Sequence, residues 1–370
     1  MTTTILCAGA LARPHSAARG SGPETGAPTP APIADGALAR TIRRARVAAR
    51  ARQSALVPDA LPDEAWLRER FALDGTVAAC ALPASRDPGP DVLVRPVHLQ
   101  LAMDHLVLAP LHGLELARDE AETLAARANA MLADESLRLR VVEPDAWRLE
   151  SIAGGGGAAD LAGVAQLLAR SARMAAGRNV DAYLPSGAAA RRWRQLANLV
   201  QMAWFEHPIN ATREADGRLP VNGLWLEGCA GGAGARPFAR VVTTDPAIAG
   251  LAQRAGVEAR LVGTRDRSGG FAADWGAAVS APDDGGAVLL APDFWRQAVS
   301  DGDLHDWEQA WQRFERWFEA LLAAAPRVAA RDLRLVLTGE RSTIELARSP
   351  ADRWKAWRRL GLATLLREHA

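Results

Sequence analysis

RRWRQLANLVQMAWFEHPINATREADGRLPVNGLWLEG, residues 191–228, decides the fold, because it places polar groups between an apolar helix and an apolar strand. Apolar residues recur at three-and-four spacing from Trp193 to Trp204, which predicts an amphipathic helix over 188–205. His207-Pro208 ends that helix, since proline lacks an N–H and pushes the preceding residue out of the helical region.

The second half of this stretch predicts a turn at Asp216-Gly217 and a strand over 220–226. Alternation along that strand places Asn222 on the same face as Leu224, and a buried amide needs hydrogen-bond partners. The candidate partners are Asn198, Gln201, Asn210, Arg213 and Glu214. The candidate ligand-binding residues are these five together with His207, Asn222, Trp225 and His98.

Two interpretations of these polar groups stay open. In the first, they satisfy one another and the end of the helix, and so fix a tight helix-turn-strand corner. In the second, they line a small polar pocket that receives a ligand. The stretch has neither an activated nucleophile nor the spacing of metal ligands, so it predicts no catalytic residue and no metal.

Composition and charge limit the function classes. The chain has 370 residues, 49% of them hydrophobic, and a formal net charge of +1, which gives no bulk electrostatic case for nucleic acid or an anionic membrane. The three cysteines lie far apart, so we expect no disulfide framework or zinc site, and a cytoplasmic location. No uninterrupted run of about 18 apolar residues occurs, so we expect no transmembrane helix. No cofactor motif is evident.

Six arginines lie within residues 38–53, which we expect to form a helix. Such a run can bind nucleic acid, but no RNA-binding aromatic motif accompanies it. We therefore expect a solvated or acid-paired helix face and no nucleic-acid partner.

Strands and helices alternate along the chain, which predicts an α/β fold with a mixed, partly parallel sheet flanked by helices. The clearest helix is expected over 303–325, where an aromatic stripe predicts core packing and Asp303 predicts the N-cap. Four consecutive glycines at 154–157 predict a flexible joint. We accordingly expect a first strand and mobile loop in 1–37, an N-terminal half in 38–157 and a C-terminal half in 158–370, together one composite domain.

A further candidate for a metal site lies near His98 and His105, with Asp104 beside the second histidine. On one continuous strand the two histidines would face opposite ways, because they are an odd number of residues apart. We expect them to be strand-end residues bonded to backbone or water.

Several motifs are similar to a known family. Asn198, Gln201-Met202, His207-Pro208, Asn210, Arg213-Glu214, Pro220-Val221-Asn222 and Leu224-Trp225 resemble the central signature of the RpfE-type regulatory proteins, which are often labelled phosphoglycerate mutase-like. Pro96-Val97-His98-Leu99 and the ending 354–359 resemble two other segments of that family. Where the family has an aromatic residue before a glycine-rich turn, this chain has Glu227-Gly228-Cys229.

The resemblance implies a degenerate alkaline-phosphatase-like core. Phosphomutases of that type need a Ser or Thr nucleophile beside an early metal-binding Asp, but the first strand is followed by Cys7-Ala8-Gly9-Ala10. We therefore expect a regulatory or ligand-binding protein without intact phosphomutase chemistry, whose partner is a small anion or a protein. The alternative is a phosphoryl-transfer enzyme in which Arg213 holds phosphate, His207 acts as acid or base and Glu214 orients a partner.

Overall fold

The computed structural model describes residues 2–14, 36–85, 89–263, 275–277, 286–326, 328, 331–354 and 360–369. Residues 15–35, within the segment where the mobile loop is predicted, and residues 355–359 of the C-terminal segment that resembles the family lie outside the described residues.

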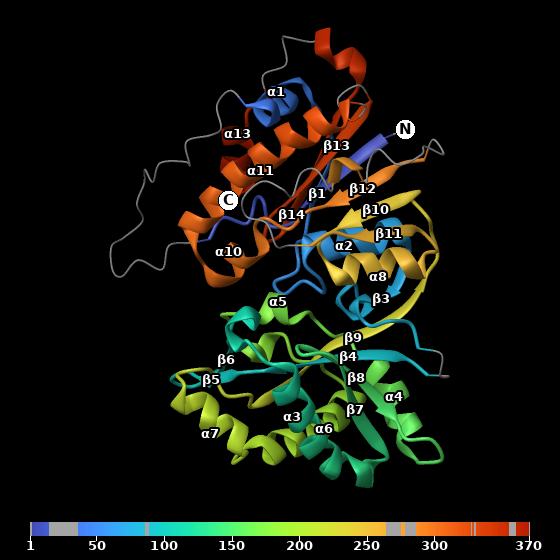
Figure 1. Cartoon of the computed structure of the whole chain (residues 1–370), viewed down its shortest axis with the longest axis vertical. Coiled ribbons are helices and arrows are strands. Elements are labelled where there is room, and N and C mark those ends of the chain that lie inside the picture. The colour runs from blue at the N-terminus through green and yellow to red at the C-terminus, as the bar shows by residue number, and fades with distance from the viewer. Residues whose placement is uncertain are drawn as a thin grey trace. The chain divides into compact units, whose positions relative to one another are not determined.

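The chain divides into two compact units, drawn in Figure 1. Unit 1 comprises Met1–Pro58 and Arg236–Ala370, and unit 2 comprises Asp59–Ala235. Unit 2 is therefore an insertion in the sequence of unit 1. The halves predicted from sequence meet at residue 157, which lies inside unit 2.

Unit 1 is built on a seven-stranded mixed sheet in the order β11-β10-β12-β1-β13-β14-β2. The five strands from β11 to β13 run parallel, and β14 and β2 add an antiparallel edge. The strands are β1 (Thr2–Cys7), β2 (Arg46–Arg52), β10 (Arg240–Thr243), β11 (Glu258–Leu261), β12 (Val288–Ala291), β13 (Asp332–Thr338) and β14 (Ser342–Arg348). This sheet and its flanking helices confirm the predicted α/β fold class.

Long aromatic side chains form the core of unit 1 on one face of the sheet. Helix α11 (Leu304–Ala324) buries its predicted stripe there together with apolar residues of α1 (Ala37–Arg44) and α13 (Leu362–His369). Figure 1 shows these three helices in unit 1. The predicted cap is confirmed, because Asp303 Oδ1 accepts a hydrogen bond from Asp306 N at 2.9 Å. Two further helices connect strands of the sheet, α8 (Pro246–Arg254) and α10 (Arg296–Asp301).

The predicted helix over 38–53 was wrong in its second half. Helix α1 ends at Arg44, and residues Arg46–Arg52 form β2, which pairs antiparallel with β14 at the edge of the sheet. Alanine and arginine both favour helix, but pairing with a neighbouring strand overrides a weak local preference. The alternation of Arg50, Ala51 and Arg52 is the signal that favours a strand here.

Unit 2 contains a five-stranded antiparallel sheet in the order β3-β9-β4-β8-β7 and a separate hairpin of β5 and β6. Helices α3, α4 and α6 contribute to its apolar core. The strands are β3 (Leu73–Gly75), β4 (Asp91–Val97), β5 (Leu99–Leu101), β6 (Leu106–Leu108), β7 (Leu137–Glu143), β8 (Ala146–Ser151) and β9 (Gly223–Ala233). The helices are α2 (Pro62–Phe71), α3 (Arg118–Leu132), α4 (Gly157–Ala165), α5 (Ala172–Ala175), α6 (Ala188–Trp204) and α7 (Pro208–Ala215).

The central stretch follows the sequence prediction closely. Helix α6 buries Trp193, Leu196, Val200, Ala203 and Trp204, which confirms the predicted apolar face. Its end before the His-Pro pair is also confirmed. The sequence missed the next helix, α7, which the same pair begins: the His207 side chain caps it and Pro208 occupies its first turn.

Strand β9 is longer than predicted, because it continues past residue 226 to Ala233. It passes through Gly228, whose φ is +118°, where its register with β4 shifts. A Cβ at this glycine would lie 2.6 Å from the Thr76 side chain, so the strand needs glycine for both backbone conformation and space.

Two short segments form 3-10 helices. One is η1 (Ala78–Ala81) in unit 2, and the other is η5 (Pro350–Trp354), which follows β14 in unit 1. Short apolar segments fit several elements equally well, and contacts distant in sequence decide among them.

The last residue of the predicted glycine joint, Gly157, packs against the backbone of Ser136. Gly157 begins α4 and is buried, and a Cβ added there would lie 2.4 Å from the backbone oxygen of Ser136. Gly157 therefore allows two backbone segments to approach closely, because it has no Cβ. No helix in the described residues is long and apolar enough to cross a membrane. All three cysteines are free thiols.

Candidate functional site

The corner predicted from sequence is held by side-chain bonds to consecutive backbone groups. Asn210 is buried, and its Nδ2 donates to the carbonyls of Trp204 at 2.9 Å and Val221 at 2.8 Å. Its Oδ1 accepts from Val221 N at 2.8 Å. Asn210 therefore joins the end of α6 to the strand-entry segment 219–222.

Arg213 is fully buried and reaches the same segment. Its Nε donates to Leu219 O at 2.8 Å, its Nη1 to Glu120 Oε2 at 2.7 Å, and its Nη2 to Leu114 O. Glu214, the next residue, is exposed, because adjacent residues on a helix point in different directions. Burial lowers the pKa of Arg213, and Glu120 opposes that shift.

Asn222 bonds to a partner that the sequence did not indicate. Its Oδ1 accepts from Leu99 N at 2.7 Å and its Nδ2 donates to Leu99 O at 2.9 Å. The Asn222 side chain therefore bonds to both backbone groups of the first residue of β5. His98 Nδ1 lies 2.8 Å from Pro220 O. Trp225 is buried and donates from Nε1 to Arg170 O at 2.9 Å.

The remaining predicted site residues lie apart from these bonds. Asn198, Gln201 and Glu214 are exposed on α6 and α7, so they are not the partners of Asn222 that we expected. His207 is half-buried, and its Nδ1 accepts from Ile209 N at 3.3 Å. Burial is the main cause that lowers the pKa of His207, and the charge of Arg127 adds to it.

Neither predicted histidine of the first half joins a metal-binding group. His105 Nδ1 lies 2.8 Å from Asp104 Oδ1 at the tip of the β5–β6 hairpin, whereas His98 bonds to Pro220. Among the described residues, no group of three or more His, Cys, Asp or Glu side chains could hold a metal ion.

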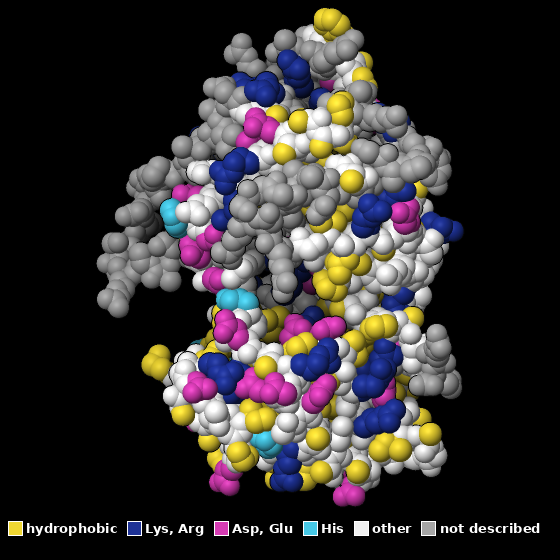
Figure 2. Space-filling view, in the orientation of Figure 1, with side chains coloured by type: hydrophobic (Ala, Val, Ile, Leu, Met, Phe, Trp, Pro, Cys, Tyr) yellow, Lys and Arg dark blue, Asp and Glu magenta, His cyan; other side chains and the backbone are white. Residues whose placement is uncertain are grey.

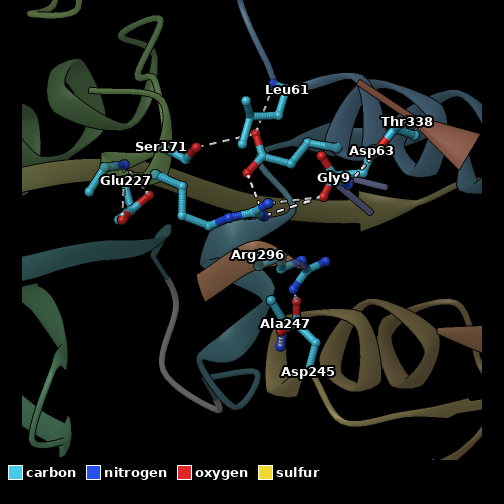
Figure 3. Close-up of polar contacts among 12 residues, drawn as sticks. Gly9, Leu61, Asp63, Ser171, Glu227, Asp245, Ala247, Arg296 and Thr338 are labelled. Carbon is cyan, nitrogen blue, oxygen red and sulfur yellow. Dashed lines mark hydrogen bonds and ion pairs between the residues drawn. The ribbon is translucent and has the colours of Figure 1, made fainter. Parts of the chain in front are cut away.

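A second arrangement of polar groups lies in unit 1, at the carboxyl ends of the parallel strands. Such ends are the usual ligand site of open α/β sheets, because the loops and helix N-termini there are free to face a ligand. After β1, Gly9 N donates to Thr338 Oγ1, at the end of β13, at 3.0 Å (Figure 3). Trp307 Nε1 donates to Gly9 O at 3.3 Å, so the turn after β1 is held on both sides.

The carboxyl end of β10 carries Thr243, Thr244 and Asp245. Thr243 Oγ1 donates to Ala291 O at 3.0 Å and accepts from Asp245 N at 3.0 Å. Asp245 caps α8 by accepting from Ala247 N at 2.8 Å, and it also binds Arg296, the first residue of α10 (Figure 3).

Thr244 differs from its neighbour. It is 8% exposed, yet its Oγ1 has no hydrogen-bond partner within the described structure. A buried hydroxyl without a partner is uncommon, because desolvation costs free energy that only a hydrogen bond offsets. We call Gly9, Thr244, Asp245, Arg296 and Thr338 the strand-end site. No sequence motif indicated it; the one available signal was a polar Thr-Thr-Asp step directly after an apolar strand.

A third group, in unit 2, consists of the buried carboxylates Asp63, Glu64 and Glu227. Arg173 lies 3.3 Å from Asp63 Oδ2 and 3.5 Å from Glu64 Oε1 (Figure 3). Glu227, at the position where the sequence departs from the family signature, accepts from Arg95 Nε at 2.9 Å.

Burial dominates the ionisation of these carboxylates. It raises the pKa of Glu64 to about 7, and the charges of Asp63 and Glu227 add to that shift while Arg173 opposes it. Burial likewise raises the pKa of Glu227, against the opposing charge of Arg95. Unit 2 thus contains a carboxyl group, that of Glu64, whose pKa lies close to neutral pH because of its surroundings.

Comparison with known proteins shows a shared fold. No family model matches the chain, and no curated protein matches it. Among solved structures, the PH0037 protein from Pyrococcus horikoshii is 12% identical, with a TM-score of 0.53 over 97% of this chain and 90% of that one. A cofactor-independent phosphoglycerate mutase from Thermoplasma acidophilum DSM 1728 is 12% identical, with a TM-score of 0.40 over 98% of this chain and 94% of that one. The similarity to PH0037 extends over both units.

Proposed function

We propose that this chain is a ligand-binding regulatory protein, of the kind that its central stretch resembles, and that its ligand binds at the strand-end site of unit 1. The Thr244 hydroxyl carries the proposal. It is buried and lacks a partner within the described chain, and it directly follows a parallel strand. A ligand that bonds to this hydroxyl would recover the free energy lost by its desolvation.

The ligand class that fits best is a small anion. Arg296 places a guanidinium beside the N-terminus of α8, where the helix dipole also favours negative charge. Asp245 occupies that end now, so an incoming carboxylate or phosphate would share Arg296 with it. Thr244 would then add a hydrogen bond that distinguishes a ligand oxygen from an apolar group.

Phosphoryl transfer at the central corner is the less favoured alternative. Arg213 would have to hold phosphate, but its guanidinium already bonds to Glu120 and to two backbone carbonyls. Freeing it would leave two backbone carbonyls without their donor and would remove one of the two arginines that pair with Glu120, which is costly. We propose instead an alkaline-phosphatase-like core in which Cys7 and Gly9 stand where a metal-binding Asp and a nucleophile would be needed.

The test is calorimetric titration of the full chain with 3-phosphoglycerate and, separately, with inorganic phosphate. We expect one of the two to bind, and Thr244→Val to weaken that binding by about tenfold, the effect of one hydrogen bond to a charged group. Thr212→Val is the matched control, because Thr212 is exposed on α7 in unit 2 and its hydroxyl donates to Pro208 O. Equal affinity in the two variants would refute the assignment of the site.

A coupled assay on 3-phosphoglycerate with added manganese tests the alternative. We expect no turnover. Robust turnover that disappears in His207→Ala would contradict the regulatory proposal and place chemistry at the corner.

A further inference from the structure

An edge strand of unit 1 carries an unusual density of positive charge. Residues 36–58 contain six arginines, Arg40, Arg43, Arg44, Arg46, Arg50 and Arg52, and no Asp or Glu. All six side chains are exposed, three on α1 and three on β2. Figure 2 shows basic side chains gathered over α1. We call α1 and β2 together the basic edge.

The geometry of β2 leaves this charge accessible. β2 is the last strand of its sheet, and the residues between its arginines are valine and alanines. Arg50 makes an exposed ion pair with Glu368 at 3.2 Å. Arg46 and Arg52 have no ion-pair partner in the described chain, and small neighbours allow a bulky ligand to approach the strand closely.

An exposed aromatic side chain follows β14, the strand that pairs with β2. Arg46 pairs with Ala347 near the end of β14, and the 3-10 helix η5 follows β14 directly. Its last residue, Trp354, has 73% of its surface exposed, whereas most tryptophans of this chain are buried. An exposed tryptophan provides a face on which an aromatic base can stack.

We propose that the basic edge and Trp354 bind single-stranded nucleic acid. Arginine forks along the extended strand would contact successive phosphates, and an unpaired base would stack on the indole. Phosphate contacts of this kind carry no sequence information, so binding would be largely independent of sequence. The formal charge of +1 does not oppose this, because the positive charge is concentrated locally.

A single strand fits better than the other polyanions. A duplex hides the faces of its bases, so Trp354 would have nothing to stack on. A lipid surface would favour apolar anchors on the same face, but β2 exposes only arginine and alanine.

The experiment is fluorescence polarisation of the full chain with a labelled 20-nucleotide poly(dT) strand over a series of salt concentrations. We expect binding whose logarithm falls linearly with log salt. The double variant Arg46→Gln, Arg52→Gln should weaken it and reduce the slope by about 1.4, since each phosphate contact on a single strand contributes roughly 0.7. Trp354→Ala should weaken binding by about tenfold and leave the slope unchanged.

The matched control is Arg191→Gln, Arg194→Gln, which removes the same charge from exposed positions of α6 in unit 2. It should bind like the unchanged chain. The proposal is overturned if poly(dT) shows no salt-dependent binding, if both double variants lose affinity equally, or if the chain binds phosphatidylserine vesicles and not poly(dT). Circular dichroism of each variant shows whether it is folded, and the slope of Trp354→Ala tests the stacking role independently.

Discussion

The Nη1 atom of Arg213 lies 2.7 Å from Oε2 of Glu120, a residue 93 positions earlier in the chain. This pair connects the helix α7 to the start of α3, and Arg213 completes it with bonds to the carbonyls of Leu219 and Leu114. The arginine that most suggested an anion site in the sequence is therefore bound within the protein.

Arg213→Ala should lower the free energy of unfolding by about 3 kcal/mol, because it removes the donor of two backbone carbonyls and one of the two arginines that pair with Glu120, the other being Arg218. Glu214→Ala is the control, and an exposed substitution should change stability by less than about 0.5 kcal/mol. Urea denaturation measures both. A stability change below about 1 kcal/mol in Arg213→Ala would contradict a structural role.

Asn210→Leu should also destabilise the corner, by about 2 kcal/mol, because Val221 N–H and two carbonyls lose buried partners. Asn222→Leu should cost less, since Asn222 is only half-buried and water can replace its bonds to Leu99. Thermal unfolding followed by circular dichroism compares the two. Equal stability of Asn222→Leu and the unchanged chain would favour the ligand-pocket interpretation of this amide.

Two adjacent threonines should respond oppositely to the same change. Thr243→Val removes a hydroxyl that bonds to Ala291 O and Asp245 N, so it should cost about 1 to 2 kcal/mol of unfolding free energy. Thr244→Val removes a hydroxyl without a partner in the described chain and should be neutral or stabilising by up to about 1 kcal/mol. Urea denaturation without ligand is the measurement, and a large loss in Thr244→Val would mean that its hydroxyl is bonded.

The free energy of unfolding should fall as the pH rises from the pKa of Glu64 in the unfolded chain to its pKa in the folded chain. Its pKa is 4.5 in the unfolded chain and about 7 in the folded one, so between these values the folded state holds a proton that the unfolded state has released. Raising the pH from 5 to 8 should therefore lower the free energy of unfolding, with a slope of up to about 1.4 kcal/mol per pH unit.

Glu64→Gln should flatten this dependence, because the amide does not titrate. Glu214→Gln, at an exposed position, should leave it unchanged. Urea denaturation at several pH values provides the comparison, and an identical slope in Glu64→Gln and the unchanged chain would assign the effect to another group.

Helices whose pattern of apolar residues lies within one segment could be predicted from the sequence. The spacing of Trp193, Leu196 and Val200 predicted α6, and the aromatic stripe after Asp303 predicted α11, because one-sided burial repeats with the period of the helix. The alternation of strand and helix predicted the mixed sheet of unit 1.

Relations between distant residues were not readable. No residue near Arg213 in the sequence identifies Glu120 as its partner. Likewise, no residue near Arg46–Arg52 indicates that this segment pairs with β14 and so forms a strand despite its helix-favouring composition. The isolation of Thr244 and the crowding of Glu64 with Asp63 and Glu227 depend in the same way on what the fold brings near them. Contacts between residues far apart in the sequence can be identified only once the whole fold is known.

The interruption of unit 1 by unit 2 affects the order in which the chain can fold during synthesis. β1 needs β12 and β13 as neighbours, and these strands are synthesised only after the whole of unit 2. Unit 2 is continuous, so it can complete its core while the first strand of unit 1 still waits for its neighbours. The nascent apolar strand β1 thus stays without its neighbours while unit 2 is synthesised, and it needs protection from misfolding contacts during that time.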